Sequence, residues 1–371
     1  MIDLRVITVI AVCKSQYMLF KGWHPLFHDS IGRESPFLET ICIPFASFAI
    51  LWGVGRWLLW GHCWDTWCRT GKLQQTVANC IERTGRGLHS GDVFTVKLLP
   101  AAARFGRCFV FRSTFIRASI DYAVRETPLC TTLSRDGYRV LTVEHLLSAL
   151  EACGIDNCRI EIEGSRDCDV SAEVPIFDGS AREWVEAINQ AGLKVAVDSC
   201  GESCEKLAPY LSEPVHVMKN DSFIAAFPYP KVNITYGIDY PQAPTIGRQW
   251  FSSTLLDESF YSKAIASART FCLYEEVEHM RNLGLIKGGS AETAIICSMS
   301  KGWLNPPLRY DDEPCRHKVL DLIGDMSLLA QGGNQGLLVA HIVAFKVCTF
   351  ALFTLFYLSI LKIITVKLYR M

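Results

Sequence analysis

Residues 142–157 read TVEHLLSALEACGIDN, and this stretch does most to decide the fold. Its apolar residues recur at helical spacing between Thr142, a residue type that caps helices, and the stop signal Gly154. His145 lies in the first turn of this otherwise apolar helix, and Glu144 directly precedes it. A polar ring is unusual at such a position unless it binds a ligand or a hydrogen-bond partner. We therefore expect a helix that delivers a carboxylate and an imidazole to a functional site.

A second pair of candidate ligands lies in the segment 312–325, which reads DEPCRHKVLDLIGD. His317 and Asp321 are four residues apart, so a helix places both side chains on one face. Alone, such a pair is more often a solvated ion pair. With His145 as a third ligand, it predicts a catalytic zinc site, which needs three protein ligands and an open position for water.

The neighbouring Glu144 completes this chemistry. Because adjacent helix residues project in different directions, His145 can bind the metal while Glu144 reaches a water held there. Zinc lowers the pKa of such a water towards about 7, and a carboxylate within hydrogen-bond reach can take its proton. The combination predicts metal-assisted amide hydrolysis.

Outside these helices, the chain is organised as two α+β halves joined by the polar run SCGESCE at 199–205. Each half has mixed strands and a pair of helices, which is the simplest architecture for this pattern. In the first half we predict strands at 76–100, 109–115 and 158–164 and a second helix at 181–192 capped by Ser180. In the second half we predict strands at 223–230, 232–240 and 336–345 and helices at 258–270, 274–283 and 314–329.

Bulk properties narrow the function classes. A chain of 371 residues suits two domains, because single cores stop growing near about 250 residues. Its formal net charge of −1 lacks the basic excess that nucleic-acid binding requires, so no nucleic-acid partner is expected. The 16 cysteines never fall as C-x-x-C, and we interpret them as mostly buried free thiols of a reducing compartment.

Both ends of the chain differ from the middle. Residues 40–55 and 347–361 carry no charge, and basic residues follow each stretch. The two ends therefore predict membrane association through 40–60 or 347–366. The alternative is that both ends come from an aberrant gene product, because the tryptophan-rich N-terminus lacks the pattern of a transit peptide.

The middle of the chain resembles a known family, the zinc-dependent UDP-3-O-acyl-N-acetylglucosamine deacetylases of lipid A synthesis, and especially their plant organellar branch. The resemblance spans about residues 72–346. It rests on GRGLHSG at 85–91, LCTTL at 129–133, the stretch at 142–157, VPIFDGSA at 174–181, ARTFC at 268–272, GLIKGGS at 284–290 and CRHKVLDLIGD at 315–325.

The resemblance implies a fold, a set of boundaries and a cellular setting. The fold would be two similar domains, each a layered β-α-α-β sandwich, with zinc at their interface. The boundaries would be a non-family segment at 1–71, domain I at 72–200, a truncated domain II at 206–346 and a non-family tail at 347–371. The resemblance also implies a monomer in the mitochondrion that binds UDP-3-O-acyl-N-acetylglucosamine, with an apolar acyl-chain passage near 275–300.

The resemblance also assigns roles to individual residues. Zinc ligands would be His145, His317 and Asp321, and Glu144 would be the general base. Lys318 would steady developing negative charge, Asp325 would orient a catalytic histidine, and Thr270 would help to hold the oxyanion. The substrate would be contacted by Phe271 at the sugar, Tyr240 at the nucleotide and Lys346 at the pyrophosphate.

The chain departs from the family at the end of its last strand. The family continues as A-[FY]-K-x-G-H, and the final histidine is its general acid, but here Val347, Cys348 and Thr349 follow Lys346. His341 is no substitute, because on an extended strand it faces away from Lys346. Three outcomes stay open: an impaired deacetylase, a silent zinc- and UDP-sugar-binding protein, or a membrane-tethered form.

Overall fold

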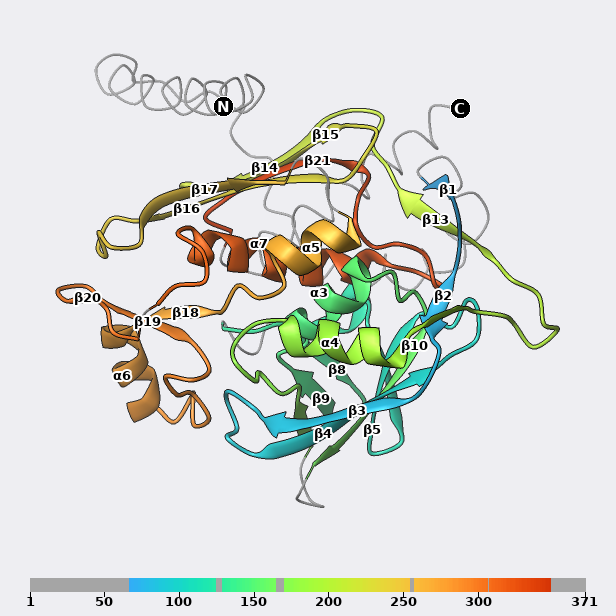
Figure 1. Ribbon diagram of the computed structural model, residues 1–371, viewed down its shortest axis with the longest axis horizontal. Helices are drawn as coiled ribbons and strands as arrows, with labels where there is room; N and C mark the ends of the chain where they lie inside the picture. The colour runs from blue at the N-terminus through green and yellow to red at the C-terminus, as the bar shows by residue number, and fades with distance from the viewer. Residues whose placement is uncertain (1–66, 125–128, 165–169, 254–256, 306, 348–371) are drawn as a thin grey trace, which may run out of the picture. The chain divides into compact units, whose positions relative to one another are not determined.

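The computed structural model describes residues 67–124, 129–164, 170–253, 257–305 and 307–347 (Figure 1). These belong to one compact unit, Trp64–Met371. The fold class is mixed α+β, as predicted. The division into two domains at 200–206 stays a prediction. The predicted apolar ends lie outside the described residues, apart from Val347. Among the helices that are described, none has the length and apolarity needed to cross a bilayer.

A five-stranded sheet organises the first half, in the order β3-β4-β10-β5-β6. Strand β10 pairs antiparallel with β4 and parallel with β5. The strand predicted at 109–115 is divided, because Arg112 and Ser113 have φ of 51° and 63° and turn the chain between β5 and β6. The bounds are β3 Ile81–Arg86, β4 Val93–Pro100, β5 Arg107–Phe111, β6 Thr114–Arg117 and β10 Cys158–Gly164.

A four-stranded sheet, in the order β11-β9-β8-β7, completes the strands around the first pair of helices. Two further two-stranded sheets pair β1 with β13 and β12 with β2. The bounds are β1 Trp67–Leu73, β2 Gln75–Val77, β7 Ala123–Val124, β8 Thr132–Arg135, β9 Tyr138–Leu141, β11 Ser171–Glu173, β12 Leu193–Val195 and β13 Glu205–Pro209.

The second half is built on the sheet β14-β15-β21-β16-β17. Its central strand β21 pairs antiparallel with β15 and parallel with β16. A small sheet, β18-β19-β20, lies beside helix α6 (Figure 1). The bounds are β14 Val215–Lys219, β15 Ser222–Pro228, β16 Asn233–Tyr240, β17 Gly247–Ser252, β18 Phe271–Leu273, α6 Tyr274–Asn282, β19 Ile295–Ser298, β20 Gly302–Trp303 and β21 Ala340–Phe345.

Four helices lie between the two five-stranded sheets in Figure 1: α3 Glu144–Ala152, α4 Arg182–Ala191, α5 Glu258–Ala264 and α7 Glu313–Met326. A single apolar core joins them to both sheets and includes Leu146 of α3 and Val319 of α7. Helix α3 crosses α7 closely, because a Cβ on Gly324 would lie 2.1 Å from the Glu144 carbonyl oxygen. This crossing is what brings the two sequence motifs together.

Three details of the helix predictions were wrong. The residue before α4 is Ala181 and not Ser180, although the Ser180 hydroxyl accepts the Arg182 backbone N–H at 3.2 Å. Thr142 does not cap α3: the residue before the helix is Val143, and the Thr142 hydroxyl donates to Glu173 at 3.1 Å. Thr142, with φ of 58°, lies outside the helix, and its hydroxyl serves a tertiary contact. The helix predicted at 258–270 ends at Ala264, and the following residues form the turn that places Ala268 against α7.

Candidate metal centre

Three side chains from α3 and α7 converge into a group that could hold a metal ion. The ligand atoms of His145, His317 and Asp321 all lie within 4.8 Å of one another. The Nε2 atoms of His145 and His317 lie 3.6 Å and 3.3 Å from the same Asp321 oxygen, Oδ1. The sequence therefore identified a set of residues that the fold brings to one point.

A hydrogen bond orients the ring of His317 for a cation. His317 is 1 % exposed, and its Nδ1 faces the Ala268 carbonyl oxygen at 2.9 Å. That contact requires a proton on Nδ1, so in the neutral ring the Nε2 lone pair points towards Asp321. Burial, the largest effect on His145, lowers its pKa and favours its neutral form. Lone pairs from two imidazoles and a carboxylate oxygen thus converge on one point, and this donor set fits Zn²⁺.

Glu144 lies beside this group at the start of α3. Its Oε2 accepts a hydrogen bond from the Thr131 backbone N–H at 3.0 Å. Burial raises the pKa of Glu144 well above its ordinary range, and the nearby Cys130 and Asp321 raise it further. A carboxylate held in such surroundings has the raised proton affinity that a general base needs.

Helix α7 also carries Lys318, between the two ligands in the sequence, and Asp325, one turn after Asp321. Lys318 Nζ lies 2.9 Å from Asp321 Oδ2. Burial alone would raise the pKa of Asp321, but its electrostatic interactions with His317 and Lys318 outweigh burial and hold that pKa well below its ordinary range. Asp325 has a pKa raised to about 7, chiefly by burial, and its Oδ1 accepts from the Thr131 hydroxyl at 2.6 Å.

A chain of aromatic contacts leads outward from Lys318. Its Nζ lies 5.8 Å from the centre of the Phe271 ring, and Phe271 meets Tyr240 edge to face at 5.4 Å. Thr270, next in the chain to Phe271, donates its backbone N–H to the Gly179 carbonyl at 2.7 Å. These contacts join Tyr240 and Phe271 into an aromatic wall that reaches Lys318, the ion-pair partner of Asp321, while the role of Thr270 stays a prediction.

The remaining predicted residue, Lys346, is engaged elsewhere. Its ammonium group pairs with Asp221, and its backbone N–H donates to the Gly237 carbonyl. The structure shows no contact between Lys346 and the metal group within its described part, so its pyrophosphate role stays a prediction. His341 is 5 % exposed, and its Nε2 lies 2.9 Å from the Thr235 hydroxyl, which confirms it as a buried strand histidine.

Sequence reasoning missed a buried ion pair, whose His89 interacts with Cys130, a neighbour of Glu144. Glu173 Oε1 lies 2.9 Å from His89 Nδ1, and its Oε2 accepts from the Ser90 N–H and hydroxyl. Burial lowers the pKa of His89, but contacts with Cys130 and Glu173 outweigh it and raise the value to about 10. Thr131 was missed as well. Two motifs could have indicated these residues: GRGLHSG contains His89, and LCTTL contains Thr131. Neither residue was given a role from the sequence.

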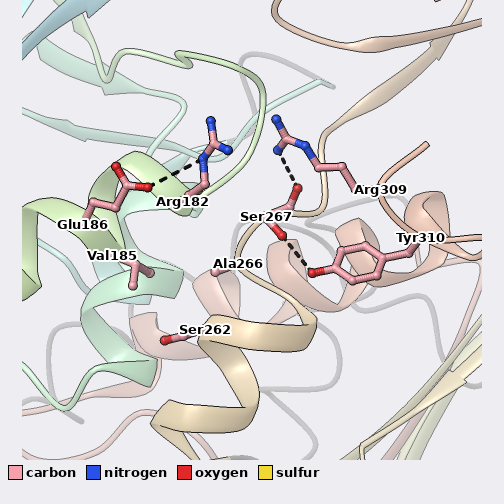
Figure 2. A pocket seen from close by; sticks show the side chains of 8 residues that line it. All are labelled: Arg182, Val185, Glu186, Ser262, Ala266, Ser267, Arg309 and Tyr310. Carbon is pink, nitrogen blue, oxygen red and sulfur yellow. Dashed lines mark hydrogen bonds and ion pairs between the residues drawn. The ribbon is translucent and has the colours of Figure 1, made fainter. Parts of the chain in front are cut away.

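A surface pocket of about 610 Å³ lies away from these residues, between α4 and the 262–310 region (Figure 2). Figure 2 shows Ser267 bonded to both Arg309 and Tyr310, while Arg182 pairs with Glu186. None of the predicted metal or substrate residues lines this pocket. Its polar groups are bonded to one another, so we do not assign the chemistry to it.

Comparison with known proteins decides the family. A family model described as LpxC, UDP-3-O-acyl N-acetylglycosamine deacetylase, matches residues 74–349, which include every residue of the metal group. The chain belongs to this deacetylase family. A different model, described as At3g27390, N-terminal domain, matches residues 1–55.

Relatives of the deacetylase region are known from plants and cyanobacteria. "Probable UDP-3-O-acyl-N-acetylglucosamine deacetylase 1, mitochondrial" of Arabidopsis thaliana is 60 % identical over 277 residues, which cover 75 % of this chain and 85 % of the relative. The UDP-3-O-acyl-N-acetylglucosamine deacetylase of Trichormus variabilis is 44 % identical over 280 residues, which cover 74 % of this chain and 93 % of the relative. The predicted family and its plant branch are therefore confirmed.

The free-thiol prediction also holds for the part of the chain that the structure describes. Each cysteine there is a free thiol, and several are buried, including Cys153 and Cys158. Burial raises the pKa of both thiols to about 12, so they are protonated and unreactive at neutral pH.

Proposed function

We propose that this deacetylase-family chain binds Zn²⁺ through His145, His317 and Asp321 and hydrolyses the N-acetyl group of UDP-3-O-acyl-N-acetylglucosamine to release acetate. The observation that carries the proposal is the convergence of three metal-donor atoms within 4.8 Å, with Glu144 directly beside them. A zinc ion in this set would activate water and polarise the acetyl carbonyl.

Side chains of the protein would then transfer the proton, stabilise the developing charge and bind the substrate. Glu144 would accept the proton of the attacking water, because its carboxylate is buried and has a raised pKa. Lys318 and the Thr270 hydroxyl would stabilise the negative charge that develops on the acetyl oxygen. Phe271 and Tyr240 would hold the sugar and nucleotide along the aromatic wall.

Apolar side chains near α6 support a site for the acyl chain. Leu283 is 60 % exposed, and Tyr274, Leu285 and Met299 are also exposed although they are large and apolar. Exposed apolar side chains that form a contiguous patch commonly mark a binding surface, and these four come from one stretch, 274–299. We propose that it receives the acyl chain of the substrate, as the family resemblance implies for 275–300.

The zinc assignment can be tested directly. The purified chain should contain one zinc ion per molecule, and His145→Ala should lose most of it, because two remaining ligands bind zinc poorly. The matched control is His216→Ala, which removes an exposed histidine from β14 and should leave the zinc content unchanged. Metal analysis together with circular dichroism checks both variants. Unchanged zinc in a folded His145→Ala variant would refute the assignment.

A second candidate function is binding without turnover. It is favoured by the residue at 349, where the family has its general-acid histidine and this chain has Thr349. In the described residues, Asp325 is hydrogen-bonded to Thr131 and not to a histidine. A chain that binds zinc and UDP-sugar with full stoichiometry but releases no acetate would establish this alternative.

The cellular setting is proposed from the relatives alone. The Arabidopsis relatives are named as mitochondrial, so we propose that the deacetylase region acts in the mitochondrion in a pathway of lipid A type. Fractionation followed by carbonate extraction would test both location and attachment. Release into the soluble fraction would exclude integral insertion through 40–60 or 347–366.

A further inference from the structure

Thr131 lies immediately before β8, is 7 % exposed, and contacts both helices of the metal centre. Its backbone N–H donates to Glu144 Oε2 at 3.0 Å, and its carbonyl accepts from the Val143 N–H at 3.3 Å. Its hydroxyl donates to Asp325 Oδ1 at 2.6 Å. One residue therefore makes two backbone contacts with the start of α3 and one side-chain contact with α7.

These contacts fix two carboxyl groups relative to each other. The N–H of Thr131 takes one oxygen of Glu144 and leaves the other for proton transfer. A hydroxyl has a single proton, and here that proton is committed to Asp325, so the hydrogen bond also sets which oxygen of Asp325 remains available. The titratable groups whose charges act on Asp325 are Asp321 and Lys318 of its own helix and Glu144 of α3. Thr131 donates a hydrogen bond to Asp325 from outside α7.

We propose that Thr131 is a positioning residue for the deacetylase reaction: it holds the base Glu144 and the carboxyl of Asp325 in register across α3 and α7. The inference rests on the proposed function, in which Glu144 takes a proton from water. Small displacements of a catalytic group reduce the rate strongly, because proton transfer requires hydrogen-bond contact. A residue that contacts neither metal nor substrate would thus control turnover.

Two substitutions of matched size separate positioning from folding. Thr131→Val keeps the shape and both backbone contacts but removes the hydroxyl, whereas Thr131→Ser keeps the hydroxyl. In the zinc-loaded chain, Thr131→Val should retain one zinc and change KM less than about twofold, but lower kcat about 10- to 100-fold. Thr131→Ser should stay within about threefold of the original kcat. A Thr131→Val chain with unchanged kcat would overturn the proposal, as would a Thr131→Ser chain that is equally impaired.

The Asp325→Ala background tests whether the hydroxyl acts through Asp325. Once the acceptor is gone, adding Thr131→Val should lower kcat no further, because the two changes remove the same interaction. In the pH profile, the limb that disappears in Asp325→Ala should move to higher pH in Thr131→Val, since the hydroxyl's hydrogen bond lowers the pKa of Asp325. Effects that multiply, or an unmoved limb, would count against the proposal.

A zinc-loaded chain that releases no acetate would mean that the proposed function has failed, and the positioning inference then has its own readout. In urea unfolding, Thr131→Val should lower the midpoint in the original chain but not in the Asp325→Ala chain. Additive unfolding midpoints would show that the Thr131 hydroxyl does not act through Asp325.

Discussion

At the scale of single residues, the backbone carbonyl of Ala268 decides which nitrogen of His317 faces the metal centre. The carbonyl engages Nδ1, and so directs Nε2 towards Asp321. Such second contacts commonly orient metal-binding histidines. The same principle operates in the buried ion pair, where Glu173 fixes His89 through its side chain and also accepts the His89 backbone N–H. The Ala268 carbonyl, which is not a predicted metal ligand, thus determines the orientation of His317, which is one.

The ion pair between His89 and Glu173 should control stability at acid pH. Its N–O distance is 2.9 Å, and both side chains are almost fully buried. For Glu173, burial alone would raise the pKa, but hydrogen bonds from His89 and Ser90 outweigh it and lower the value to about 2. The depressed pKa of Glu173 gives stability that is present above about pH 4.5 and lost as the pH falls towards 2. The raised pKa of His89 gives stability that is full below about pH 6.5 and lost as the pH rises through 10.

The corresponding variant is Glu173→Gln, which leaves His89 without its charged partner. We expect it to lower the free energy of unfolding near neutral pH by about 3 kcal/mol and to flatten its decline between pH 4.5 and 2. Urea unfolding across this pH range measures both effects. The control is Glu163→Gln, which removes the exposed partner of Lys97 and should leave the decline intact. Equal slopes in the original chain and Glu173→Gln would contradict the assignment.

At the scale of elements, the site depends on the close crossing of α3 and α7. Each helix carries part of the metal group near the crossing, with His145 in the first turn of α3 and Asp321 three residues before Gly324. The absence of a side chain at Gly324 allows the backbone of Glu144 to lie against α7. A helix normally loses stability at a glycine, so this residue has a packing reason to be there.

Gly324→Ala should therefore separate the two helices. Its Cβ would lie 2.1 Å from the Glu144 carbonyl oxygen, a backbone atom that cannot rotate away. We expect a loss of about 1–3 kcal/mol in the free energy of unfolding and weaker zinc binding, because overpacking displaces the backbone of one ligand helix. Calorimetry and zinc titration measure both.

The matched control is Gly289→Ala, whose Cβ would meet its nearest neighbour, Leu88 Cδ1, at an ordinary 3.4 Å. It should leave zinc affinity unchanged. If Gly324→Ala binds zinc as tightly as the original chain, the close helix crossing is not what sets the metal geometry.

At the scale of the whole described unit, the 332–337 turn connects distant parts of the chain. Glu151 of α3 accepts the backbone N–H groups of Gly336 and Leu337 at 2.9 Å and 2.8 Å. Glu151 also pairs with the buried Arg107 of β5. Gln74 donates to the Gly332 carbonyl from the other side. The last strand, β21, therefore starts from a turn that is anchored to the first half of the fold.

We expect the residues that follow β21 in the sequence to limit the turnover of this chain. Cys348 and Thr349 replace the glycine and histidine of the family motif. Changing Cys348→Gly and Thr349→His, together with a family-type C-terminal helix, should raise turnover at least about 100-fold, because a general acid contributes about 10²- to 10⁴-fold. Acetate release at saturating substrate measures this, with Thr349→Ala in the same background as the control. An unchanged rate would mean that protonation of the leaving amine does not limit this chain.

The sequence by itself determined the ligand types, because four-residue spacing on α7 and the first turn of α3 are local properties of a helix. It also determined the mixed α+β class and the family, because the family motifs and their order can be read from the sequence alone. Only the tertiary structure decided that His145 meets Asp321, that Thr142 bonds Glu173 in place of capping α3, and that Thr131 joins Glu144 to Asp325. Those contacts join residues far apart in the chain, and their partners depend on how the helices cross and not on any periodicity within one segment.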